Sequence, residues 1–131
     1  MQMYPLTLLG TLAALAVYFW SSIPVGRARG KFGVKAPAVT GPPEFERAFR
    51  AHQNTMEQLM LFLPLAWIVA SLFGDTWGGI YAAVWCIGRI AYVIGYIADA
   101  QKRAAGFLIS MLASVAALVG AIVAVVIDLV R

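Results

Sequence analysis

Four polar side chains share one face of the stretch that leads into an apolar segment of the chain. They are Arg47, Arg50, Asn54 and Glu57, at spacings of three, four and three residues. Because successive residues of a helix turn by about 100°, the four lie within an arc of about 80°. The guanidinium groups suit an anion, since arginine grips a carboxylate in a bidentate fork and stays charged. The acid and the amide on the same face would suit an ammonium group or amides.

A second polar face is predicted on the next apolar segment, provided that its helix continues beyond residue 98. Its members are Arg89, Tyr92, Tyr96, Asp99 and Arg103, which again fall within an arc of about 80°. The second predicted span enters the membrane from one side, and the third span returns to that same side. The two polar faces can therefore meet there. Together they would fit a small zwitterionic, peptide-like molecule with several carboxylates.

A purely structural interpretation of these polar residues is also open. An ionised group that faces lipid at mid-bilayer costs a few kcal/mol, so the side chains should face protein or a water-filled cavity. Glu57 and Arg89 are natural ion-pair partners, and such a pair could simply hold two helices together. The number of arginines argues against this alternative, because one pair needs one arginine, whereas four converge here with two acids and two phenols.

The elements that must position these residues are membrane helices. Hydrophobic residues make up 62% of the 131 residues and charged residues 12%, which is outside the range of soluble globular proteins. Crossing a bilayer takes about 20 helical residues, and four apolar stretches are long enough. The sequence therefore predicts an all-α membrane protein, with residues 1–131 as one domain that forms a four-helix bundle. The expected helices cover about residues 4–25, 43–73, 77–101 and 105–130.

The basic residues predict the orientation. Eight of the ten lie between the first and second spans or between the third and fourth. Under the positive-inside rule these two loops, loops one and three, are cytoplasmic. Attraction of anionic lipid to this basic surface is a secondary expectation, and nothing supports nucleic-acid binding. With one histidine, His52, and one cysteine, Cys86, no metal site is expected.

Two motifs carry a family resemblance. GPPEFERAFRAHQNTME and GRIAYVIGYIADAQKR resemble the signatures of the MAPEG family, the membrane-associated proteins in eicosanoid and glutathione metabolism. The similarity covers roughly residues 28–108 without a gap, and it is greatest to the members that conjugate glutathione. The resemblance implies a homotrimer, with glutathione bound at each subunit interface and open to the cytoplasmic side and the bilayer.

The resemblance also implies roles for individual residues. The positions that match glutathione-binding residues of the family are Arg29, Arg50, Asn54, Glu57, Tyr92, Tyr96 and Arg103. Arg103 matches the catalytic arginine that holds the glutathione sulfur as a thiolate. Lowering a thiol pKa of about 8.5 by about 2 units corresponds to roughly 2.7 kcal/mol. Arg47, Arg89 and Asp99 are expected to support the site without contacting the reacting atoms.

The activity that the resemblance implies is a membrane-bound glutathione transferase of detoxification. It would conjugate glutathione to hydrophobic electrophiles, with peroxidase activity toward lipid hydroperoxides as a further expectation, in the endoplasmic reticulum or a bacterial inner membrane. One alternative is a non-catalytic, lipid-binding accessory protein of the same fold. Another is a small four-helix drug exporter that uses Glu57, which the many nearby arginines make a poor fit for cationic drugs.

The chain departs from the family pattern at three places. Gly30 and then Lys31 follow the position of Arg29, where a second adjacent arginine would stand. His52 replaces a glutamine, and Gln58 replaces an aromatic residue. Leukotriene synthesis is therefore not expected, and a broader transferase activity is.

Overall fold

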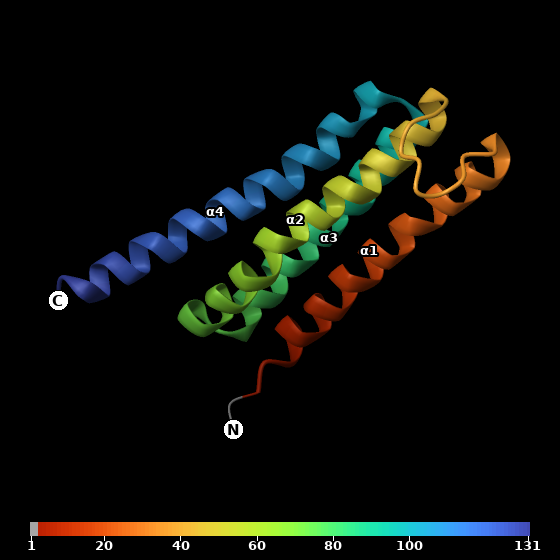
Figure 1. Cartoon of the computed structure of the whole chain (residues 1–131). Helices are drawn as coiled ribbons and strands as arrows, with labels where there is room; N and C mark the ends of the chain where they lie inside the picture. The colour runs from red at the N-terminus through yellow and green to blue at the C-terminus, as the bar shows by residue number, and fades with distance from the viewer. Residues whose placement is uncertain (1–2) are drawn as a thin grey trace.

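The computed structural model of the chain describes residues 3–131, which form four long helices and one short 3-10 turn (Figure 1). In chain order these are α1 (Pro5–Phe32), α2 (Pro43–Phe73), α3 (Asp75–Ala98), η1 (Ala100–Arg103) and α4 (Ala104–Leu129). Four helices are long and apolar enough to cross a membrane. Helix α3 lies behind α2, with α1 and α4 on either side of the pair in Figure 1.

Helix α1 is longer than the sequence predicted, because it ends at Phe32 and not near residue 25. Gly33 ends it in a left-handed conformation with φ 66°, which glycine adopts without strain, and its N–H donates to the carbonyl of Arg29. Arg29 and Lys31 lie in the last turn, where positive charge complements the helix dipole. Much of the expected first loop is therefore helical.

Helix α3 is shorter than predicted at its C-terminal end, because it ends at Ala98 and not at residue 101. Asp99 is extended, with φ −161°, and its carboxylate accepts a hydrogen bond of 2.8 Å from the N–H of Gln101. Asp99 thereby caps η1. The expected continuous face from Tyr96 through Asp99 to Arg103 is wrong, since the chain changes direction between them.

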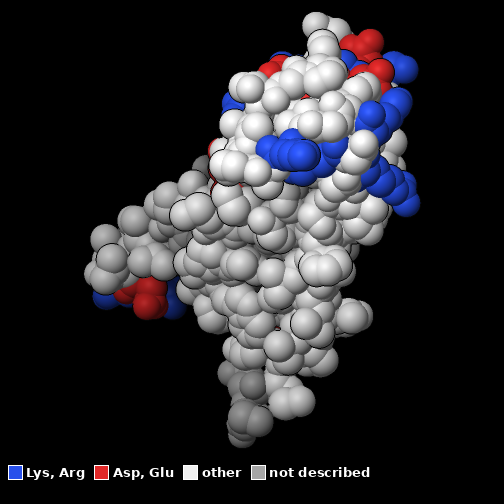
Figure 2. All heavy atoms as spheres, turned by 45° about the vertical axis from the view of Figure 1, so that its right-hand side comes forward, with Lys and Arg blue, Asp and Glu red and all other residues white. Residues whose placement is uncertain are grey.

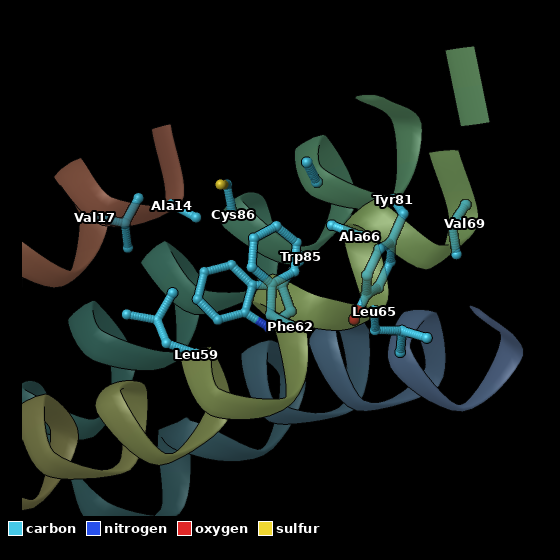
Figure 3. Packing of buried hydrophobic residues seen from close by; sticks show 11 residues of the cluster. Ala14, Val17, Leu59, Phe62, Leu65, Ala66, Val69, Tyr81, Trp85 and Cys86 are labelled. Atoms are coloured by element: carbon cyan, nitrogen blue, oxygen red, sulfur yellow. The ribbon is translucent and has the colours of Figure 1, made fainter. Parts of the chain in front are cut away.

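Aromatic side chains fill the centre of the bundle (Figure 3). Phe62 of α2 stacks on Trp85 of α3 with ring centroids 4.4 Å apart, and neither side chain is exposed. Tyr81 packs against Phe62 at 5.3 Å, and its hydroxyl forms a 2.7 Å hydrogen bond with Ser114 of α4. These contacts join three helices and fix the levels at which α2 and α3 face each other.

Glycines let α3 and α4 approach closely near η1. A side chain at Gly106 would collide with the backbone of Tyr92, and one at Gly88 would come within 2.7 Å of the backbone nitrogen of Ser110. Small residues of this kind let membrane helices pack backbone against backbone. The contact fixes where α4 leaves the bundle, and the far half of α4 diverges from the other helices (Figure 1).

A carboxylate from α3 caps the start of α1. Asp75 accepts hydrogen bonds from the N–H of Leu6 at 2.9 Å and from the N–H of Thr7 at 2.8 Å. The hydroxyl of Thr7, which is fully buried, donates to the same carboxylate at 2.8 Å. The first N–H groups of a helix have no partner within it, and Tyr4, the residue before α1, supplies no side-chain cap. Asp75 therefore ties α1 to the turn between α2 and α3.

Candidate functional site

The polar faces of α2 and α3 meet at Asn54. Its amide oxygen accepts a 3.2 Å hydrogen bond from Nη2 of Arg89, and its amide nitrogen donates at 3.2 Å to the carboxylate of Glu57. The direct ion pair expected between Glu57 and Arg89 is not formed. Glu57 lies on the exposed side of α2, whereas Arg89 points into the bundle, so the amide of Asn54 links the two charges.

Arg89 is fully buried in this membrane bundle. Its Nη2 also donates to Oγ1 of Thr55 at 2.9 Å, and its guanidinium carbon lies 4.0 Å from the centre of the Tyr92 ring. Within residues 3–131, Nε and Nη1 of Arg89 have no hydrogen-bond partner. Burying a charge with unpaired donors is costly, so this arginine holds hydrogen-bonding capacity that the single chain does not use.

Sequence analysis missed Thr55, the second partner of Arg89. Its signal was present, because Ala51, Thr55 and Leu59 recur at a spacing of four on the buried face of α2. A hydroxyl on an otherwise apolar buried face needs a hydrogen-bond partner. The hydroxyl of Thr55 donates at 2.8 Å to the carbonyl of Ala51, one turn earlier in the same helix. Because Thr55 donates its hydroxyl hydrogen to Ala51, the lone pairs of its oxygen are free to accept from Arg89.

A polar cavity of about 390 Å³ opens beside this network, at the corner where α3 passes through η1 into α4. Its lining residues come from α2, α3, η1 and α4: Asn54, Tyr92, Ala100, Gln101, Arg103, Ala104 and Phe107. Three of the residues predicted from the sequence, namely Asn54, Tyr92 and Arg103, thus share one cavity. Gln101 and Phe107 were not anticipated, because they border it only through the change of direction at Asp99.

Arg103 reaches this cavity from the 3-10 turn. Its Nη1 donates to the carbonyl of Ala100 at 2.7 Å, and its guanidinium carbon lies 5.2 Å from the centre of the Tyr96 ring. The Tyr96 and Tyr92 rings meet edge to face with centroids 5.5 Å apart. The side chain of Arg103 is exposed, so its other donors are open to a ligand.

Two more predicted residues lie on the exposed surface of α2 beside Asn54. Arg50 donates to the side-chain oxygen of Gln53 at 3.2 Å, one turn before Asn54. The carboxylate of Glu57 accepts the hydrogen bond from the amide of Asn54. Both side chains are exposed and neither lines the cavity within the single chain.

The other predicted residues make different contacts. Arg29 donates to the carbonyls of Val34 and Ala38, at 3.3 and 2.7 Å, and its guanidinium carbon lies 5.0 Å from the centre of the Phe45 ring. It therefore holds the loop after α1 against α2. Arg47 donates from Nε to the carbonyl of Ile97 at 3.3 Å.

His52 lies between α1 and α2, away from the cavity. Its ring stacks on Tyr18 with centroids 4.6 Å apart, and its Nδ1 forms a 2.7 Å hydrogen bond with the hydroxyl of Ser21. It thus contributes to helix packing. The described residues contain no group of three or more side chains that could hold a metal ion.

Comparison with known proteins assigns the chain to a family. Residues 7–123 match the model of the MAPEG family. The chain belongs to the MAPEG family. The match covers most of the chain and confirms the resemblance that the two motifs carried. Membership of this family, together with four helices that can span a bilayer, makes the chain a multi-pass membrane protein.

Named MAPEG relatives are about 40% identical to the chain. Human microsomal glutathione S-transferase 2 is 41% identical over 90 residues, which are 69% of this chain and 61% of that protein. Bovine leukotriene C4 synthase is 41% identical over 99 residues, which are 76% of this chain and 63% of that protein. The aligned part thus spans about six tenths of both relatives. An uncharacterized protein of Synechocystis sp. is 44% identical over 115 residues, 88% of this chain and 84% of that protein.

Proposed function

We propose that this MAPEG protein is a membrane-bound glutathione transferase that conjugates the glutathione thiolate to hydrophobic electrophiles, with peroxidase activity toward lipid hydroperoxides. The observation that carries the proposal is the polar cavity bordered by Asn54, Tyr92 and Arg103, with the exposed Arg50 and Glu57 beside it on α2. The names of two relatives, a glutathione transferase and a leukotriene synthase, support the same class of reaction.

The charges around the cavity complement a tripeptide with two carboxylates and one ammonium group. Arg50 and Glu57 are exposed, and their recorded contacts lie within α2, so a carboxylate and an ammonium could replace or extend those contacts. The hydrogen bond from Arg89 fixes the amide of Asn54, whose nitrogen is thereby directed toward Glu57. A ligand would thus meet side chains that are already oriented, which lowers the entropic cost of binding.

Arg103 is the residue proposed to activate the sulfur. A free thiol with a pKa of about 8.5 is only a few per cent ionised at neutral pH, and a nearby guanidinium favours the thiolate. Arginine cannot act as a base here, because it stays protonated at accessible pH. The thiolate attacks the electrophilic carbon of the second substrate, a carbon–sulfur bond forms, and the leaving group departs with the electron pair of the broken bond.

A homotrimer would complete the site. Arg29 lies in the last turn of α1 and not at the cavity of its own chain, so we assign it to the cavity of a neighbouring subunit. The hydrophobic substrate would enter from the bilayer, in the groove between α1 and α4 of adjacent subunits. We also propose that the basic end of the bundle faces the cytoplasm, as the positive-inside rule predicts.

The test uses the purified full chain in detergent with a chloronitrobenzene substrate. Arg103→Ala should lower turnover about 25-fold at pH 7, because the thiolate fraction falls from about three quarters to a few per cent when the thiol pKa returns from about 6.5 to about 8.5. It should also remove the ultraviolet band of the bound thiolate while glutathione still binds. Lys102→Ala is the matched control, since Lys102 is an exposed neighbour that does not line the cavity. Unchanged turnover in Arg103→Ala would exclude this mechanism.

Glutathione binding is tested separately by calorimetry. Glu57→Gln should weaken binding of glutathione, because the ammonium group loses its counter-charge. Affinity equal to that of the unmodified protein would assign Glu57 a structural role only. Tight glutathione binding without turnover of any electrophile or hydroperoxide would favour the alternative of a non-catalytic accessory protein.

A further inference from the structure

A second polar groove lies at the basic end of the bundle and shares no residue with the cavity described above. It has a volume of about 540 Å³ and is bordered by α1, the start of α2 and the end of α3. We call it the basic groove, and its residues are Pro24, Arg27, Ala28, Lys31, Phe32, Glu44, Arg47, Ala48, Ile97 and Ala98. Figure 2 shows lysine and arginine side chains gathered at this end of the molecule.

The basic groove carries positive charge that the protein does not neutralise. Lys31 and Glu44 form an ion pair at 3.3 Å on its rim and offset each other. Arg27 and Arg47 remain, and between residues 3 and 131 neither has an acidic partner. Arg47 uses only Nε, toward the carbonyl of Ile97, and no hydrogen bond within that range involves the side chain of Arg27. Two guanidinium groups with free donors therefore border one groove.

The basic groove lies where the apolar surface of α1 and α3 ends. On α1, the exposed side chains one and two turns before Arg27 are Ile23 and Phe19. Below Ala98 on α3, Ile94 and Ile90 are likewise exposed. Isoleucine and phenylalanine in such positions face acyl chains in a membrane protein, so the two arginines lie at headgroup depth.

The seam between α1 and α3 continues downward as an apolar groove. A hollow of about 370 Å³ follows it, with Leu9, Ala13, Ile80 and Cys86 among its lining residues. Ala13 and Cys86 of this hollow lie eleven residues from Pro24 and Ile97 of the basic groove, about 16 Å along the helix axes, so an acyl chain that extends along the seam reaches the hollow with its end.

We propose that the basic groove binds the phosphodiester group of an anionic phospholipid, whose acyl chain follows the seam between α1 and α3. Guanidinium groups pair with phosphate in a bidentate fork, and the water-poor headgroup region strengthens the contact. Basic pockets between membrane helices suit such headgroups. A zwitterionic lipid would add an ammonium group beside two arginines, which costs affinity. This inference does not depend on the proposed transferase activity.

Native mass spectrometry of the delipidated full chain tests the site, with phosphatidylglycerol and phosphatidylcholine as competing probes. The unmodified protein should retain phosphatidylglycerol preferentially. Arg27→Gln should weaken its retention about fivefold, the value of about 1 kcal/mol per basic residue near a membrane surface. The double variant Arg27→Gln/Arg47→Gln should weaken it about 25-fold if the contributions add.

The matched control is Lys35→Gln, which removes one charge from the same end of the chain but outside the basic groove. It should change retention less than twofold, since only a diffuse surface charge is lost. Soluble glycerol phosphate should not displace the lipid, because it lacks the acyl chain. Glutathione affinity and the thermal midpoint of Arg27→Gln should match those of the unmodified protein.

Three results would each overturn the proposal. The first is equal retention of the two lipids by the unmodified protein, a measurement that needs no variant to fold. The second is an equal loss in Lys35→Gln and Arg27→Gln, which would indicate general surface attraction. The third is displacement by glycerol phosphate, which would make the ligand a free phosphate.

Discussion

Asp75 and Arg89 are both charged residues of α3, but the protein treats their hydrogen-bonding groups in opposite ways. The carboxylate of Asp75 accepts three hydrogen bonds, all from Leu6 and Thr7 at the start of α1. Arg89 uses one nitrogen, toward Asn54 and Thr55, and leaves two without partners among residues 3–131. The completed contacts of Asp75 stabilise the fold, whereas Arg89, which is buried and does not line the cavity, is linked to it through the amide of Asn54. The start of α3 and its middle part thus have different roles.

The largest effect on stability is expected from Asp75→Ala. It removes three hydrogen bonds to a charged acceptor and leaves the first N–H groups of α1 unpaired, so the thermal midpoint in detergent should fall by several degrees. Thr7→Val removes one of those contacts and should cost about 1 kcal/mol. Glutathione affinity should stay unchanged in both. A loss of affinity in a fully folded Asp75→Ala variant would contradict this division of roles between Asp75 and Arg89.

Arg89→Met should have the opposite effect to Asp75→Ala, with weaker glutathione binding and no loss of stability. Methionine fills most of the volume and removes a buried charge, so stability should be unchanged or higher. The amide of Asn54 loses the donor that fixes its orientation, and we expect about tenfold weaker glutathione binding, which is about 1.4 kcal/mol. Calorimetry and thermal unfolding of the same sample measure both quantities. A large drop in stability with unchanged affinity would make Arg89 a structural residue like Asp75.

The smallest effect is expected from Lys31→Met, which tests an exposed charged contact as a reference for the other two. The side chains of Lys31 and Glu44 are 68% and 58% exposed, so solvent screens their attraction. The free energy of unfolding should change by less than about 0.5 kcal/mol. Chemical denaturation measures this change. A loss of unfolding free energy larger than that of Thr7→Val would show that the exposure of a contact does not determine how much it stabilises the fold.

The sequence predicted helices and family well because both depend on local patterns. Apolar length gives a spanning helix, and the spacing of Arg50, Asn54 and Glu57 predicts one face of α2, whatever the rest of the chain does. The trimer, the site roles and the orientation stay predictions. The contacts that the sequence did not predict join distant positions. The hydrogen bond between Thr7 and Asp75 spans 68 residues, and no periodicity within one helix indicates it.

The corner at Asp99 shows a second limit of periodicity. Tyr96 and Arg103 have a spacing of seven, which predicts a shared face two turns apart on one helix, whereas the guanidinium carbon of Arg103 lies 5.2 Å from the centre of the Tyr96 ring. They come this close through a 3-10 turn after an extended residue, not through two helical turns. The spacing alone could not reveal that Gln101 and Phe107 would border the same cavity. The two residues are therefore near each other, but by a backbone path that the sequence did not predict.

The crossing of α3 and α4 at Gly106 affects how sequence variation in this protein should be interpreted. A methyl group there would push α4 away from the backbone of Tyr92, and Phe107, the next residue, would move with it. In a systematic survey of substitutions, Gly106 would score like a ligand-contacting position although it has no side chain to offer. A severe effect of Gly106→Ala would therefore reflect the displacement of α4, and it would not show that Gly106 takes part in binding or chemistry.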